Sequence, residues 1–150
     1  MVAFLAIFGA LIFLFALIGI VLYILFAYAF YKMALNAGLE NPWMAWIPIL
    51  QWYILGKLIK SLKISTYQIP SIELVLPAAT LIVMALNKVA VLGSLLSLAN
   101  YILILFALNK LYKMYKPEQA TLYTVLSIFG LPIPFIFMSL KDLKPVEVTD

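Results

Sequence analysis

Residues 2–31 form a run of thirty amino acids without a charged side chain. A helix needs about 20 apolar residues, each adding about 1.5 Å, to cross the hydrocarbon core of a bilayer. The run therefore predicts a transmembrane helix. A cleaved signal peptide would instead carry a basic residue before a shorter apolar run and small residues at a cleavage site after it. The sequence has neither signal, so we expect the helix to be retained.

The rest of the chain has the composition of a membrane protein. Hydrophobic residues make up 67% and charged residues 11%, whereas a soluble domain carries roughly 25% charged residues. We predict one all-α domain over residues 1–150, a polytopic membrane helix bundle with about four transmembrane helices and one interfacial amphipathic helix. The four spans are expected at about residues 3–31, 69–86, 90–108 and 121–140.

Local signals mark the ends of these spans. Gly38 is a helix-stop signal after the first span. Asn87-Lys88 is the polar break before the third span and predicts a tight helical hairpin. The third helix is expected to continue beyond Leu108 until Pro117 ends it. Three helix breakers interrupt the fourth span, so we expect a kinked or partly broken helix there: Gly130, Pro132 and Pro134.

The stretch Glu40–Lys63 differs from the plain apolar spans. It holds all three tryptophans of the chain, and Pro48 divides it. Before Pro48, Trp43 and Trp46 are expected to anchor the chain at the headgroups. After Pro48, an apolar helix face (Ile54, Leu55, Leu58, Ile59 and Leu62) opposes a polar face (Tyr53, Lys57, Lys60 and Lys63). This pattern is typical of a helix lying in the membrane interface, which we place at about residues 43–63.

The distribution of lysines decides whether this stretch crosses the bilayer. If it lies on the surface, four spans with the N-terminus outside leave seven lysines in the cytoplasm and three outside. If it crosses, the better of the two orientations leaves six inside and four outside. The positive-inside bias favours the first arrangement. We therefore predict a multi-pass plasma-membrane protein with its N-terminus outside and with residues 32–68 and 109–120 in the cytoplasm.

Two groups of lysines are expected at the cytoplasmic surface: Lys57, Lys60 and Lys63, and Lys110, Lys113 and Lys116. Attraction to anionic lipid headgroups is worth about 1 kcal/mol per lysine. We therefore expect a bilayer with anionic headgroups to be the main partner, although an acidic protein would use the same side chains. The chain has no arginine for bidentate phosphate contacts, and we expect no nucleic acid.

Few residues could support catalysis. The chain has no cysteine and no histidine, which removes thiol chemistry and the usual base near neutral pH. Intramembrane acid catalysis needs two facing carboxylates, and Glu73 is the one that could lie within the bilayer. We expect no enzymatic activity, no cofactor and no metal.

Two intramembrane polar sites are weighed against structural roles. Glu73 could couple protons or pass cations, but an interfacial ion pair with Lys60 or Lys63 is favoured. Asn100, with Ser94 and Ser97, could line a polar path. Interhelical hydrogen bonds, worth about 0.6 kcal/mol each, are the favoured reading of this group.

The first 63 residues carry a series of short motifs: Tyr31-Lys32-Met33-Ala34, Gly38, Asn41-Pro42-Trp43, Ala45-Trp46-Ile47-Pro48 and Tyr53-Ile54-Leu55-Gly56-Lys57. Together they resemble small, uncharacterised bacterial polytopic membrane proteins. In these proteins a first span leads into a Trp-Ile-Pro segment and an amphipathic helix, followed by two or three spans. The resemblance implies this topology and a bacterial plasma membrane, and it supplies no catalytic residue.

From these features we expect a non-enzymatic integral membrane protein, an accessory, interaction or immunity-type component of a bacterial plasma membrane. Another membrane protein or a second copy of the chain is its further expected partner. The alternative is a small transporter or channel that uses Glu73 and the polar cluster around Asn100. Four short spans enclose little volume, so this alternative requires an oligomer.

Overall fold

The long charge-free run forms helix α1, Val2–Asn36. The computed structural model describes residues 1–146, with all of their side chains except those of residues 2, 3, 5 and 90. The expected domain also includes residues 147–150, which lie outside the described part. The N–H of Leu39 donates to the carbonyl of Ala34 (3.1 Å), and that of Gly38 donates to Leu35 (3.0 Å). Gly38 has φ +72°, which favours glycine, and the predicted stop is confirmed.

The chain is mostly helical, so the all-α expectation is confirmed at that level. The predicted turn between the second and third apolar helices is also confirmed, since Val89 N–H donates to the Leu86 carbonyl (3.0 Å). After α1 the elements are η1 Pro42–Trp46, α2 Pro48–Ile59, β1 Leu62–Ile64, β2 Tyr67–Ile69, α3 Ile72–Leu86, α4 Ala90–Tyr115, η2 Pro117–Gln119, α5 Ala120–Ser127 and α6 Ile133–Leu140.

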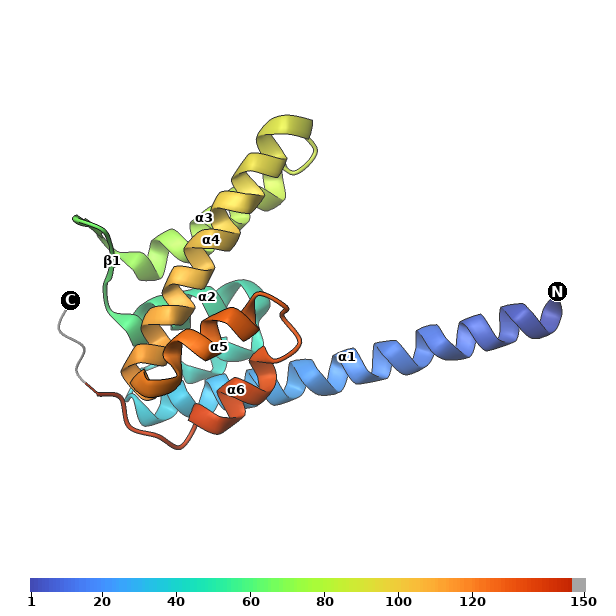
Figure 1. Ribbon diagram of the computed structural model, residues 1–150, viewed down its shortest axis with the longest axis horizontal. Helices are drawn as coiled ribbons and strands as arrows, with labels where there is room; N and C mark the ends of the chain where they lie inside the picture. The colour runs from blue at the N-terminus through green and yellow to red at the C-terminus, as the bar shows by residue number, and fades with distance from the viewer. Residues whose placement is uncertain (147–150) are drawn as a thin grey trace.

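These elements form a helical body with two projecting arms (Figure 1). The body contains the end of α1, all of α2, the start of α3, the end of α4, and α5 and α6. One arm is the N-terminal part of α1, and the other is the tip of the α3–α4 hairpin. Large side chains that are fully buried in the body include Phe30, Met33, Ile54, Leu55, Ile59, Ile72, Leu76, Leu111, Tyr112, Phe137 and Leu140.

The stretch expected to form one interfacial helix over residues 43–63 does not do so. It divides into η1 and α2, then Lys60 adopts φ 61°. Leu62 pairs with Ile69 in the antiparallel hairpin of β1 and β2. The predicted apolar face is buried, but it packs inside the body, chiefly against α3 and α4. An amphipathic pattern identifies a face that must be buried, and protein can cover that face as well as lipid can.

Two of the helices observed differ in detail from the expected spans. The second helix begins at Ile72 rather than at residue 69, because residues 67–69 form β2. The fourth expected span, 121–140, is divided into α5 and α6, which have eight residues each and are separated by a turn. Each covers about 12 Å, less than half of the hydrocarbon core. Gly130 has φ +74° in this turn, so the break expected from Gly130, Pro132 and Pro134 is confirmed.

The α5–α6 hairpin packs back onto the body. Its α5 helix lies along α4, where the rings of Tyr112 and Tyr123 meet edge to face at 5.6 Å. Its α6 helix lies along α1, where Phe137 meets Phe26 and Phe30 at centroid distances of 4.9 and 5.2 Å. The hairpin therefore starts and ends in the body.

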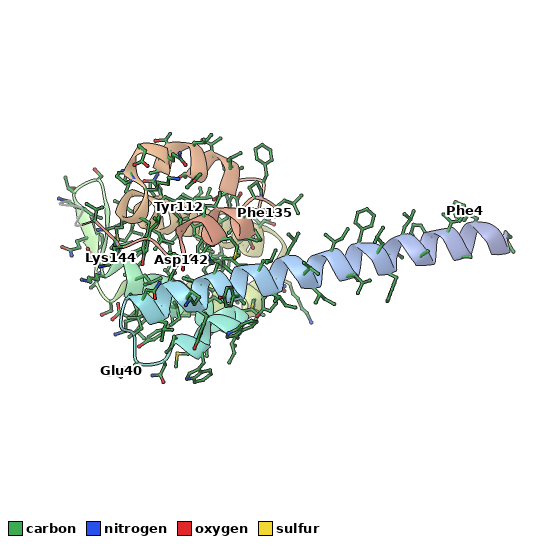
Figure 2. All side chains as sticks on the ribbon, turned by 90° about the horizontal axis from the view of Figure 1, so that it is seen from below. Phe4, Glu40, Tyr112, Phe135, Asp142 and Lys144 are labelled. Atoms are coloured by element: carbon green, nitrogen blue, oxygen red, sulfur yellow. The ribbon has the colours of Figure 1, made fainter. Side chains whose placement is uncertain are left out.

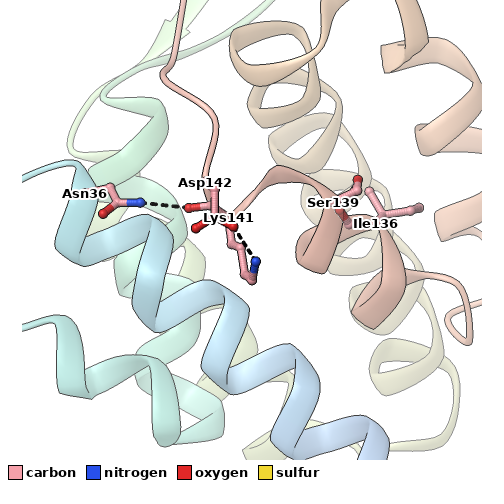
Figure 3. Close-up of polar contacts among 5 residues, drawn as sticks. All are labelled: Asn36, Ile136, Ser139, Lys141 and Asp142. Carbon is pink, nitrogen blue, oxygen red and sulfur yellow. Dashed lines mark hydrogen bonds and ion pairs between the residues drawn. The ribbon is translucent and has the colours of Figure 1, made fainter.

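The segment after α6 lies beside the ends of α1 and α4. The side-chain amide of Asn36, the last residue of α1, donates to the Lys141 carbonyl at 2.8 Å (Figure 3). Further on, the N–H of Val146 donates to the carbonyl of Met114 near the end of α4 (2.6 Å). Figure 2 shows Asp142 and Lys144 at the end of the molecule opposite Phe4.

Candidate functional site

The two groups of lysines lie on neighbouring elements, and we call five of them together the basic surface: Lys57, Lys60, Lys63, Lys113 and Lys116. It joins α2, the β-hairpin and the end of α4, because β1 lies against α4. Lys57, Lys60, Lys63 and Lys113 are exposed, and Lys116 is half-buried. Lys110 differs from the expectation, since only 9% of it is exposed and its ammonium donates to the Ser61 hydroxyl at 3.2 Å. Lys110 therefore tethers α4 to the segment before β1 and offers little surface to lipid.

The two tryptophans expected to act as anchors lie at different positions along α1. Trp43 and Trp46 are 51% and 41% exposed, as membrane anchors would be. The Trp46 carbonyl accepts a hydrogen bond from the Tyr23 hydroxyl of α1. Tyr23 precedes Asn36 by thirteen residues, about 20 Å along the helix. The chain thus runs back along α1 to Trp46 before α2 begins, so Trp46 lies well before the end of α1, whereas the Trp43 indole donates to Asn41, which lines a pocket with Lys57.

Glu73 lies in the first turn of α3 and faces α2. One of its carboxylate oxygens is 3.9 Å from the Lys57 ammonium, and the two side chains are 25% and 43% exposed respectively. Glu73 therefore pairs with Lys57, rather than with Lys60 or Lys63 as expected. At 3.9 Å and partly exposed, such a pair contributes little to stability.

The other polar residues in the predicted intramembrane site lie in the α3–α4 hairpin. The Asn100 amide donates to the Thr80 hydroxyl across the hairpin at 3.4 Å, and Ser97 donates to the Gly93 carbonyl of its own helix at 2.7 Å. Ser94 lies on an exposed side of α4. Thr80 follows Glu73 by seven residues, about 10 Å along α3. The structure therefore does not join Glu73 to the Asn100 group in one polar path.

A glycine that was quoted only as part of a motif brings α2 and α3 together. A Cβ atom on Gly56 would lie 2.2 Å from the Cα of Glu73 and 2.5 Å from its amide nitrogen. The backbones of α2 and α3 are therefore in direct contact at this position. An isolated glycine inside a helical pattern was the available signal for such a close approach.

A large apolar cavity lies between the two arms. It is open to the outside and has a volume of about 590 Å³, within the usual range for ligand sites. Its walls come from α1, α4 and the α5–α6 turn, and Gln51 and Trp52 of α2 also contribute. The Gln51 amide already donates to the Ala45 carbonyl at 2.8 Å. The cavity can hold an apolar group such as a lipid acyl chain.

Residues suited to metal chemistry do not gather in the described part of the chain. No group of three carboxylates, histidines or cysteines among residues 1–146 could hold a metal ion. Comparisons with known protein families, with characterised proteins and with solved structures find no match to this chain. Function must therefore be argued from the geometry described above.

Proposed function

We propose that this chain is a non-enzymatic integral membrane protein, an accessory or interaction component of a bacterial plasma membrane. Its two arms insert into the bilayer, and its basic surface contacts the anionic cytoplasmic leaflet. One observation carries the proposal. Two helices, over Ala6–Asn36 and Val91–Tyr115, are long and apolar enough to cross a membrane, yet only 6% and 17% of their most apolar windows are buried.

The exposure of these windows argues against the main alternative for an apolar helix. The core helix of a soluble protein is mostly buried, because exposed apolar surface costs about 25 cal/mol per Å² in water. Large exposed apolar patches mark membrane or protein contacts. Along α1, apolar side chains project on all sides of the free arm (Figure 2). Lipid can cover all these faces at once.

The path of the chain favours three crossings. In this arrangement α1 runs inward, and the α3–α4 hairpin crosses outward and returns. The α5–α6 hairpin then dips into the bilayer and returns to the same side. This last step rests on the bond from Asn36 to Lys141 and on the bond from Val146 to Met114. The cytoplasmic side then holds nine of the ten lysines, with Lys88 alone outside, a stronger bias than seven to three.

The α5–α6 turn is suited to an apolar environment. An unpaired backbone group in hydrocarbon costs several kcal/mol. The N–H groups of residues 128–131 and of Ile133 all donate to backbone carbonyls within the turn or the end of α5. Pro132 and Pro134 have no N–H to satisfy, and the Ile128 carbonyl accepts from the Tyr101 hydroxyl at 2.8 Å. The prolines thus reduce the number of donors at the point where the helix is broken.

Single-cysteine labelling tests the arrangement, since the chain has no cysteine of its own. An impermeant thiol reagent added to intact cells should label Asn87→Cys, but not Ser65→Cys or Asp142→Cys. All three should be labelled after permeabilisation. Labelling of Asp142→Cys from outside, with Ser65→Cys protected, would restore the fourth crossing. Release of the protein by alkaline carbonate would overturn membrane insertion altogether.

The accessory role has a separate test. Crosslinking in intact membranes should yield a reproducible adduct, either with a second copy or with one other membrane protein. A survey over several positions on both arms that finds no such adduct would refute this role. It would leave the membrane topology unaffected.

A further inference from the structure

A small pocket with both polar and apolar walls lies beside the end of α1, away from the apolar cavity. It has a volume of about 280 Å³ and is formed by residues 38–41 and the second half of α2. Two of its lining residues carry opposite charges, Glu40 and Lys57. Lys32 lies four residues before the end of α1, about 6 Å along the helix. In the proposed orientation Lys32 lies at the cytoplasmic end of the first span. The pocket is then close to the headgroup layer, which is roughly 5–8 Å thick on each side of a bilayer.

The Lys57 ammonium is held in place without being enclosed. It lies 5.5 Å from the centre of the Tyr53 ring, within the range of a cation–π contact. Glu73 flanks it at 3.9 Å, and 43% of the lysine side chain remains exposed. A phosphate group can approach this cation from the pocket.

Glu40 provides the complementary charge. It lines the same pocket as Lys57, yet among residues 1–146 it forms no ion pair. Next to it, the side-chain oxygen of Asn41 accepts from the Trp43 indole at 3.3 Å, which leaves the amide nitrogen able to donate. Figure 2 shows Glu40 at the end of the molecule opposite Phe4. The pocket thus offers a cation, a carboxylate and an amide donor.

We propose that this pocket binds the phosphoethanolamine headgroup of a membrane phospholipid. The phosphate oxygens accept hydrogen bonds from Lys57 and Asn41, and the primary ammonium donates to Glu40. A choline headgroup carries no N–H to donate, and a glycerol headgroup has no cation for Glu40. The site therefore selects ethanolamine lipids. This assignment rests on the proposed function, because that function brings the pocket to the membrane surface.

The test compares three lipids on the purified full-length protein. Binding of phosphatidylethanolamine, phosphatidylcholine and phosphatidylglycerol is measured by native mass spectrometry or titration in detergent. The variants are Glu40→Gln and Lys57→Gln. Each has a matched control outside the pocket and outside the basic surface, Glu118→Gln for the carboxylate and Lys88→Gln for the cation. Alkaline-carbonate extraction of the same membranes reports insertion independently.

The protein should prefer the ethanolamine lipid over the choline lipid by about tenfold, as expected for one hydrogen bond between charged groups. Glu40→Gln should weaken this preference, because the ammonium bonds a neutral amide oxygen less strongly than a carboxylate, without weakening phosphatidylglycerol binding. Lys57→Gln should weaken the ethanolamine and choline lipids alike, while both controls behave as wild type.

Three results would overturn the assignment. The first is equal binding of the ethanolamine and choline lipids by the unaltered protein. The second is a Glu40→Gln variant that loses phosphatidylglycerol to the same extent as phosphatidylethanolamine. The third is free phosphoethanolamine binding as tightly as the lipid, which would mean that a soluble ligand is the occupant. If the protein resists carbonate extraction in these cases, the membrane proposal stands and the pocket alone is refuted.

Discussion

Replacing Gly56 by alanine should destabilise the body through a single methyl group. That methyl would lie 2.2 Å from the Cα and 2.5 Å from the amide nitrogen of Glu73. Both obstructing atoms belong to the backbone, so no side-chain rotation can relieve the contact. To bring the shorter distance from 2.2 Å to the 3.4 Å of ordinary contact, α2 and α3 must move apart by about 1.2 Å.

The size of the effect follows from two opposing terms. Overpacking a core typically costs about 1–3 kcal/mol, and a backbone clash belongs at or above the upper end of this range. Alanine regains about 1 kcal/mol of helix propensity over glycine. We therefore expect the free energy of unfolding to fall by about 2 kcal/mol. For a chain of this length, this corresponds to a melting temperature lower by about 4–8 °C.

Tryptophan fluorescence provides the assay, because all three tryptophans lie in η1 and α2. Thermal melts in detergent should show the earlier transition for Gly56→Ala. The matched control is Gly9→Ala in the free arm of α1, where an added Cβ meets nothing within 4 Å, so its melting temperature should stay the same or rise. A Gly56→Ala variant with the same melting temperature as the wild type would refute the direct contact between α2 and α3.

Two further substitutions test the intramembrane polar residues by the same melt. Glu73→Gln should cost less than about 1 kcal/mol, because its partner lies 3.9 Å away and both side chains are partly exposed; failure of this variant to accumulate would contradict that. Asn100→Leu should leave the melting temperature unchanged or raise it, because the bond to Thr80 is long and the Asn100 oxygen is buried without a partner in residues 1–146. A lower melting temperature for Asn100→Leu would show that the amide stabilises the hairpin.

The predictions that succeeded depend on short stretches of chain. The stop at Gly38 and the turn at Asn87-Lys88 were read from local backbone and polarity signals, and both are present. The apolar positions of α2 were also identified correctly, from Ile54 to Ile59. The end of that helix was missed, because Lys60 leaves the helix with φ 61° and the next residues pair in a hairpin. This pairing depends on contacts between segments that periodicity does not report.

The candidate site was predicted less completely than the fold. Lys57 and Glu73 were both singled out, but their pairing depends on the close approach of α2 and α3 at Gly56. Lys110 shared the spacing of its exposed neighbours and turned out to be buried against Ser61. Helical spacing assigns a residue to a face of its own helix, and it contains no information about which other element covers that face.

By itself, the sequence determined that this chain is mostly helical and that it carries long apolar segments; it predicted about four spans, whereas two helices of the described residues are long and apolar enough to cross a bilayer. These properties follow from composition and local periodicity, which each segment carries alone. Only the tertiary structure decided that α2 is buried in a body and that residues 121–140 turn back at Gly130. It also brought Asn36 beside Lys141, and Glu40 and Lys57 into one pocket. Such contacts join residues far apart in the chain, and they exist only once the helices have packed.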